Sequence, residues 1–199
     1  MAAADREKQF SDAELVRRTL SDAANFAFLV ERYEAKLMRY ICRFTAGERQ
    51  LAEDIFQEAM IKVYRNLNGY NPNWPFSAWI YRIVRNEALN QLRRRRLQNT
   101  ISLDGEEDGS ASLFQVLTDG EDLAEDAVRR ETAQRVRELL GKLRPDYREV
   151  LVLRYLEERD YNEISFILQK PLGTVVVLLK RAKSAFRQLA LKYNLLNHE

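Results

Sequence analysis

Residues 161–186 read YNEISFILQKPLGTVVVLLKRAKSAF, a short amphipathic segment followed by a turn and by a longer segment that starts at a proline. Proline fits the first turn of a helix but cannot continue a preceding one, so we expect one helix over 161–168 and a second from about 171. A helix pair with so short a turn has the helix-turn-helix shape, which places its second helix in a DNA major groove. Helical bundles use the same hairpin, so the shape alone does not establish DNA binding.

The second helix of this pair has two chemically different sides. The apolar residues of one side recur at steps of three and four, which predicts a side packed on a core. They are Val175, Leu179, Ala182, Phe186 and Leu189. The cations Lys180, Arg181 and Lys183 lie elsewhere on the helix and suit a polyanion. The sequence therefore predicts a helix that is buried on one side and binds a partner with the other.

Helical patterns also fill the first half of the chain. Ser11 is followed three residues later by Glu14, which predicts a capping box at a helix start, and a second helix starts near Ser21. An apolar stripe follows, formed by Phe26, Leu29, Val30, Tyr33, Leu37 and Tyr40. We expect this helix to end at Ala46-Gly47 and further helices over 51–67 and from the cap Ser77 to about 96.

An acidic segment separates this half from the helix-turn-helix. Residues 97–123 contain three glycines and no clear periodicity, apart from a short turn expected near 113–117, so we expect a flexible linker. Helical periodicity returns over 123–143 and 146–155. No strand pattern of useful length occurs. The expected fold is all-α, with two small helical domains over 1–96 and 124–199 joined by the linker 97–123.

The composition excludes several classes of protein. The chain has 199 residues with one Cys (Cys42) and one His (His198), which excludes a disulfide framework and argues against a structural metal site. No apolar run approaches the roughly 18 residues of a membrane span, and the polar N-terminus is not a signal peptide. We therefore expect a cytoplasmic protein with no membrane insertion, no metal and no cofactor.

The charges are unevenly distributed although the net charge is only +2. Six arginines and one acid lie between Arg82 and Arg96, and nine acids with no Lys or Arg lie between Leu97 and Val128. Residues 164–198 hold six Lys or Arg and no acid. Two basic blocks separated by an acidic one predict two surfaces for a polyanion. A catalytic site is not indicated, because the chain has no Gly-rich phosphate loop, no GxSxG motif and no histidine placed for catalysis, so we expect a non-enzyme.

Two segments of the first domain carry further signals. DIFQEAMIKVYRNL, residues 54–67, places Asp54, Gln57 and Glu58 on one helix face. NWPFSAWIYRIVRN, residues 73–86, interleaves aromatic residues with arginines, and single-stranded DNA binds to such sites through stacked bases and neutralised phosphates. Trp74 and Phe76 are the expected stacking residues, whereas Trp79 is expected to belong to the core.

These two segments, the linker and LRPDYREVLVLRYLEERDYNEISFILQKPLGTV together resemble bacterial RNA polymerase sigma factors of the extracytoplasmic-function group, over about 170 residues. The resemblance implies that the chain binds core RNA polymerase and directs it to promoters. It implies that the first domain docks on the clamp helices of the largest polymerase subunits and melts the −10 element. The second domain would contact the polymerase flap and read the −35 element as duplex DNA. An anti-sigma factor is an expected further partner.

The resemblance also assigns residues to these contacts. Asp54, Gln57 and Glu58 match a D-x-x-Q-E signature for polymerase binding, and Ile61 and Arg65 lie on the same side. Asn86 matches the position that helps to capture a flipped −10 base, which fits the physics of reading an unstacked base. The implied −10 surface comprises Trp74, Phe76, Arg82, Arg85, Asn86, Arg93 and Arg94, with Arg95 and Arg96 as further phosphate contacts.

The implied −35 surface departs from the family pattern. It comprises Thr174, Val176, Val177, Leu178, Lys180, Arg181 and Lys183 in a helix-turn-helix over about 161–181. The family usually has Lys, Ser and Arg where this chain has Val176, Val177 and Leu178. Ser165 and Gln169 also replace an Ala and a Gly of the pattern. The sequence leaves open whether the apolar tip formed by residues 176–178 reads DNA or binds a protein.

Two other functions are weighed against a sigma factor. A two-domain transcription regulator would bind duplex DNA without polymerase and would not need the Asp54, Gln57 and Glu58 face. A sigma mimic that sequesters an anti-sigma factor would use residues 176–178 as a protein interface. Polymerase binding tests the first alternative, and promoter-specific transcription tests the second.

Overall fold

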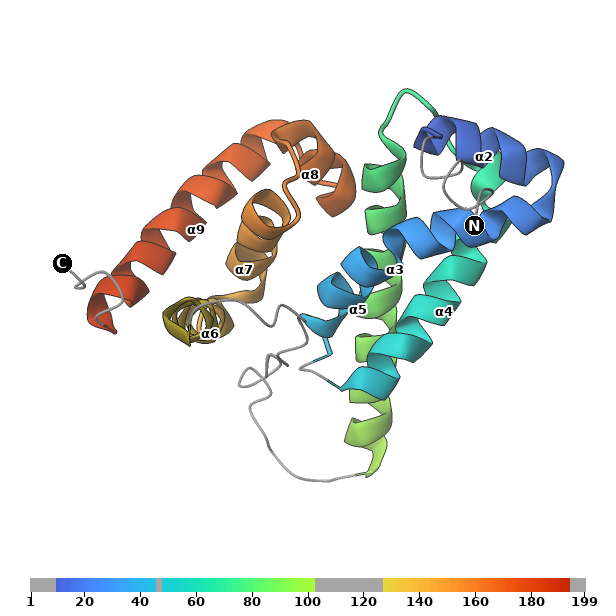
Figure 1. The fold of residues 1–199 in the computed structure, drawn as a ribbon. Helices are drawn as coiled ribbons and strands as arrows, with labels where there is room; N and C mark the ends of the chain where they lie inside the picture. Colours follow the sequence, from blue (N-terminus) through green and yellow to red (C-terminus); the bar gives the residue numbers. More distant parts are fainter. Residues whose placement is uncertain (1–9, 46–47, 103–126, 194–199) are drawn as a thin grey trace. The chain divides into compact units, whose positions relative to one another are not determined.

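The computed structural model describes residues 10–45, 48–102 and 127–193 (Figure 1). Helices are the only regular elements among these residues, and they form two compact units. One unit contains α2 to α5 and the other contains α6 to α9. The predicted all-α fold with two small helical domains is therefore confirmed. The predicted break at 46–47, most of the linker and the turn near 113–117 lie outside the described residues.

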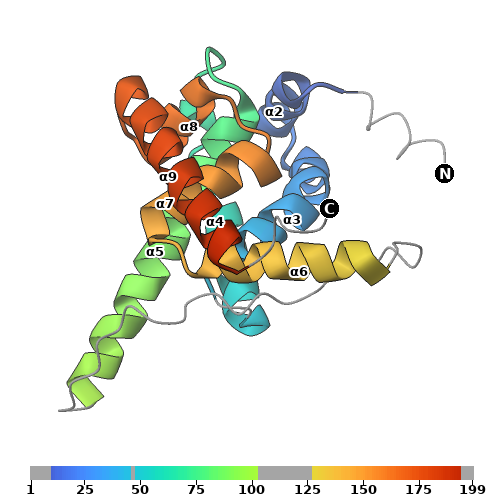
Figure 2. The same cartoon turned by 90° about the vertical axis from the view of Figure 1, so that its left-hand side faces the viewer.

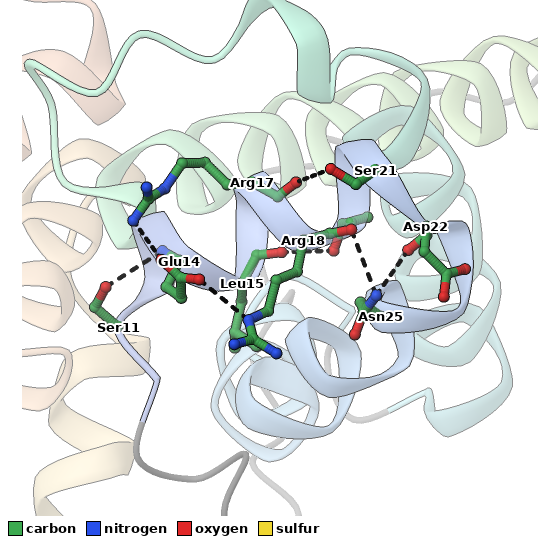
Figure 3. A network of polar contacts seen from close by, with 9 residues as sticks. Ser11, Glu14, Leu15, Arg17, Arg18, Ser21, Asp22 and Asn25 are labelled. Carbon is green, nitrogen blue, oxygen red and sulfur yellow. Dashed lines mark hydrogen bonds and ion pairs between the residues drawn. The ribbon is translucent and has the colours of Figure 1, made fainter.

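The first helix, α2 (Asp12–Ser21), starts at the predicted cap. The Ser11 hydroxyl accepts a hydrogen bond from the Glu14 backbone N–H at 3.2 Å (Figure 3). The predicted capping box is only half correct, because the Glu14 carboxylate turns to Arg17 and Arg18 instead of the Ser11 backbone. Two cations within one turn compete successfully for a carboxylate at an exposed helix start.

Helices α3 (Phe26–Cys42) and α4 (Arg49–Arg65) supply most of the core of the first unit. A short 3₁₀ turn, η1 (Ala23–Asn25), precedes α3 and is capped by the Asp22 side chain, close to the predicted start. The predicted stripe of α3 is largely buried, and α4 buries seven residues: Leu51, Ala52, Ile55, Phe56, Ala59, Met60 and Val63. The side of α4 that these residues leave outside carries the predicted polymerase-binding residues.

Helix α5 (Phe76–Ser102) differs from the prediction at both ends. It starts directly after Pro75, so Ser77 lies inside the first turn and is not the cap. It continues to Ser102, past the predicted end near 96, because no Gly or Pro interrupts the chain before Gly105. The first six residues of the predicted linker (97–102) are therefore helical.

A buried carboxylate joins α4 to α5. Glu87 is 2% exposed and forms an ion pair with Lys62 of α4. The Gln91 amide donates a second hydrogen bond to it at 3.0 Å. The Lys62 side chain is 43% exposed, so solvent weakens the pair, but the buried carboxylate still needs both donors and thereby ties α4 to α5.

The second unit consists of α6 (Ala127–Gly141), α7 (Pro145–Leu151), the π-helical turn η3 (Val152–Leu156), α8 (Tyr161–Leu168) and α9 (Leu172–Lys192). Helix α9 packs against α6, α7 and α8 (Figure 2). The helix predicted over 146–155 is thus an α-helix that ends in a π turn. Its apolar residues Val150, Leu151 and Leu153 are buried.

Arg148 holds the end of α6 in place. Its guanidinium donates hydrogen bonds to the carbonyls of Leu140 at 2.8 Å and Leu143 at 3.1 Å, and also to Gly141. Leu140 and Gly141 end α6 and Leu143 follows it, so Arg148 adds a donor where the helix itself provides few. Burial lowers the pKa of Arg148, but an arginine stays charged at neutral pH.

The helix-turn-helix forms as predicted. The Asp160 side chain and Glu163 cap α8 reciprocally, with hydrogen bonds of 2.8 and 2.9 Å. Gln169 ends α8 in the left-handed region at φ 54°, and α9 follows at a bend of 103° (Figures 1 and 2). This bend lies within the roughly 90–120° of DNA-binding helix pairs. No single described helix has the length and apolarity of a membrane span, although α8 and α9 meet those two criteria as a bent pair.

Candidate protein- and nucleic-acid-binding surfaces

The five predicted polymerase-binding residues form one outward stripe on α4. Their positions follow the spacing i, i+3, i+4, i+7 and i+11, which is one side of a helix. All five are exposed: Asp54, Gln57, Glu58, Ile61 and Arg65. We call this set the α4 stripe.

The α4 stripe makes no polar contact with the part of the chain that the structure describes. Among the described residues, none of its five side chains forms a hydrogen bond or an ion pair, whereas the neighbouring Glu53 pairs with Arg49 at 2.9 Å. Ile61 lies near the centre of the stripe and is 43% exposed. Two carboxylates, an amide and a guanidinium around an exposed isoleucine can bind a polar protein surface with an apolar centre.

Sequence reasoning missed an aromatic residue at the edge of this stripe. Tyr64 is 45% exposed and its ring contacts Phe26 of α3, with centroids 5.1 Å apart. It follows Ile61 by three positions, so helical spacing alone could have placed it beside the stripe. Exposed tyrosines are enriched in the well-packed centres of protein interfaces.

The predicted −10 residues lie on α5 and on the loop before it. Trp74, Arg82, Arg85 and Asn86 are half-buried, whereas Arg93 and Arg94 are exposed. Arg82, Asn86 and Arg93 share one side of α5 by their spacing of four and seven. Burial lowers the pKa of Arg82, but the guanidinium stays charged at neutral pH. These residues thus combine cations, one amide and one partly exposed indole along α5 and the loop before it.

Phe76 is the exception, and its predicted role in base stacking is wrong for this structure. It is 2% exposed, and its ring contacts Tyr33 and Tyr70 at centroid distances of 5.6 and 5.4 Å. A ring enclosed by other rings has no free face for a base. Trp79 is buried beside it, as predicted.

The predicted −35 residues lie in the first half of α9. Thr174, Lys180, Arg181 and Lys183 are exposed, as are Val176 and Val177 at 48% each. Leu178 is half-buried, so the exposed apolar tip consists of two valines and not of three residues. The step of 100° per residue turns position 178 away from 176 and back towards the packed side.

Tyr155 of η3 adds to this surface and was not predicted. It is 50% exposed, and the Lys183 amine lies 5.4 Å from its ring centroid. A hydrogen bond to Tyr155 raises the pKa of Lys183, and the amine is charged at neutral pH with or without this shift. No sequence pattern joins residues that are so far apart along the chain. Among the described residues, no three metal-binding side chains gather at this surface or elsewhere.

Family models match both units of the chain. The family model for sigma-70 region 2 matches residues 29–98, and the one for sigma-70 region 4 matches residues 133–186. The first match contains the α4 stripe and the −10 residues, and the second contains the helix-turn-helix.

Several curated relatives match almost the whole chain. The ECF RNA polymerase sigma factor SigW of Bacillus subtilis is 36% identical over 171 residues, which is 84% of this chain and 89% of the relative. The RNA polymerase sigma-H factor of Pseudomonas aeruginosa is 35% identical and covers 89% and 92% of the two chains. The ECF RNA polymerase sigma-E factor of Escherichia coli K12 is 32% identical and covers 89% and 93%.

Two solved structures share the fold. CnrH, solved in complex with the cytosolic domain of CnrY, has a TM-score of 0.60 at 23% identity and covers 88% of this chain and 94% of CnrH. The sigma factor RpoE of Bartonella quintana, solved with the anti-sigma factor NepR, has a TM-score of 0.60 at 20% identity and covers 83% and 96%. On the family matches and the curated relatives, the chain belongs to the extracytoplasmic-function group of sigma-70 RNA polymerase sigma factors.

Proposed function

We propose that this sigma factor binds core RNA polymerase through the α4 stripe, opens the −10 element along α5 and reads the −35 element with α9. The α4 stripe is the observation that carries the proposal. Its side chains are exposed and have no partner among the described residues, so they can contact another molecule without breaking a contact of the fold. Because sigma factors act on RNA polymerase, the α4 stripe is best explained as the contact to core polymerase.

The −10 element is held as a single strand along α5, between Arg82 and Arg94. Asn86 reads one unstacked base, because an amide offers both a donor and an acceptor to a base edge. Arg82, Arg85, Arg93 and Arg94 bind phosphates, and the partly exposed Trp74 ring stacks on a base. Phe76 supports this site from the core and does not contact the strand.

The −35 element is read as duplex by the α8–α9 pair. The bend of 103° and the exposed cations at positions 180, 181 and 183 support this docking. The second unit also contacts the polymerase flap, and the first contacts the clamp helices. An anti-sigma factor is a further partner of the chain. RpoE was solved with the anti-sigma factor NepR and CnrH with the cytosolic domain of CnrY, and this chain has exposed apolar residues that an anti-sigma factor could contact.

The experiment is a pull-down with purified core RNA polymerase combined with a strand-opening assay. The full chain should bind core, and the resulting complex should raise the fluorescence of 2-aminopurine placed in the −10 element of a duplex promoter. A DNA-binding regulator would bind promoter duplex without core, and a sigma mimic would bind an anti-sigma factor without opening DNA. Either result would contradict the proposal.

A further inference from the structure

The outward side of α9 combines an apolar tip with an uninterrupted run of cations. Val176, Lys180, Lys183 and Arg187 follow each other at steps of four, three and four, so they form one line along the helix. Val177 and Arg181 start the neighbouring line. All six are exposed, and the chain has no acid between residues 164 and 198.

The cations of this surface are available to a polyanion. Lys180, Arg181 and Arg187 form no ion pair with any of the described residues, and the Lys183 amine forms a hydrogen bond with Tyr155. Four cations without an acid favour DNA over a protein partner for this side of the helix. The valines therefore sit where the N-terminal end of a recognition helix meets base edges, and the cations sit where it meets phosphates.

Gly173 supports a close approach of the duplex at the same place. It precedes Val177 by four positions and lies on the outward side. A Cβ built there meets nothing within 4 Å, so the packing of the protein does not require a glycine. Glycine is also a weaker helix former than alanine, and Gly173 lies in the first turn of α9. A glycine that the fold does not need leaves the helix surface flat beside the two valines.

The chemistry of the valines selects among base edges. Major-groove edges present donors and acceptors, and the thymine C5-methyl group is their one apolar feature. A valine over guanine would remove the O6 and N7 acceptors from water without replacing their hydrogen bonds. We propose that Val176 and Val177 make α9 a reader of thymine methyl groups, so that the −35 element of this sigma factor is specified by thymines under the helix tip. The inference rests on the proposed role of α9 as the duplex reader.

The test removes single methyl groups from DNA. Promoters are first selected from a pool with a randomised −35 region by in vitro transcription with the holoenzyme formed from the full chain and core polymerase. Each thymine of the selected region is then replaced by deoxyuridine, which lacks only the methyl group. Burial of one such carbon corresponds to about a fourfold change in affinity, so we expect about fourfold weaker promoter binding at one or two adjacent thymines and no change elsewhere.

Protein variants link this effect to the valines. Val176→Ala and Val177→Ala should each abolish the sensitivity to deoxyuridine at one thymine while general promoter binding persists. Leu191→Ala is the matched control, because Leu191 is a 52% exposed apolar residue near the other end of α9. This variant should keep the full sensitivity to deoxyuridine.

The outcomes separate the inference from the function on which it rests. If the holoenzyme transcribes selectively but deoxyuridine has no effect at any position, the methyl reading is wrong and the sigma function stands. If the effect persists in both valine variants, other residues read the methyl groups and the inference is also wrong. If no promoter is selected at all, both proposals fail.

Discussion

Replacing Asp54 and Glu58 together by alanine should separate polymerase binding from folding. Both carboxylates are exposed on α4, and neither has a partner among the described residues. They lie four positions apart, and like charges at this spacing destabilise a helix by about 0.2–0.5 kcal/mol. Alanine is also the stronger helix former. The double replacement should therefore leave the free energy of unfolding unchanged or raise it slightly.

The same double replacement should weaken polymerase binding, and by much more than it changes the free energy of unfolding. Truncating one partner of a buried, hydrogen-bonded charge pair at an interface costs about 2–5 kcal/mol, and the lower figure corresponds to about thirtyfold weaker binding. Fluorescence anisotropy of the labelled chain, titrated with core polymerase, measures the dissociation constant. Thermal unfolding followed by circular dichroism measures the stability of the same samples.

The neighbouring residue supplies a matched control. Glu53→Ala also removes an exposed carboxylate from α4, but Glu53 pairs with Arg49 and lies outside the α4 stripe. It should bind core with nearly unchanged affinity. The reasoning is refuted if the double variant binds core as tightly as the native chain, or if Glu53→Ala weakens binding to the same extent.

Three further replacements test the rest of the account. Asn86→Ala should reduce discrimination at one base of the −10 single strand. Arg94→Ala should instead weaken the binding of all sequences alike and lower its salt dependence. Equal and uniform losses of affinity in filter binding would remove Asn86 as a base reader. Gly173→Ala should raise the stability of the second unit by about 0.5–1 kcal/mol and yet weaken −35 duplex binding, because the added methyl group occupies the open outward side; unchanged duplex binding would exclude a close approach. Arg148→Met should lower the free energy of unfolding by about 2–4 kcal/mol in urea titrations, because three carbonyls lose the donor that Arg148 supplies. The control Arg144→Met removes an exposed arginine and should cost less than about 1 kcal/mol. Similar losses in the two variants would contradict the capping role of Arg148.

The sequence predicted those elements that local chemistry determines. The cap at Ser11, the apolar stripe of α3 and the turn at Gln169 each depend on residues within about one helical turn or on strict periodicity. The α4 stripe was predictable for the same reason, because residues at helical spacing share a face wherever the helix lies.

Other features depend on contacts between distant residues and could not be predicted in this way. Phe76 was expected to stack on DNA because it stands among arginines, but Tyr33 from another helix covers its ring. Glu87 was an isolated acid in an arginine run until the fold placed Lys62 beside it. Pairings of this kind follow from how helices pack, and no spacing along the chain encodes them.

The central claim is that the chain makes core RNA polymerase promoter-specific. In vitro transcription with core enzyme and the purified chain, on a library of genomic promoter fragments, tests this claim most directly. The account predicts strong transcripts from a small set of fragments that share one −10 and one −35 element, with core alone producing none of them. A product pattern identical to that of core alone would contradict the account.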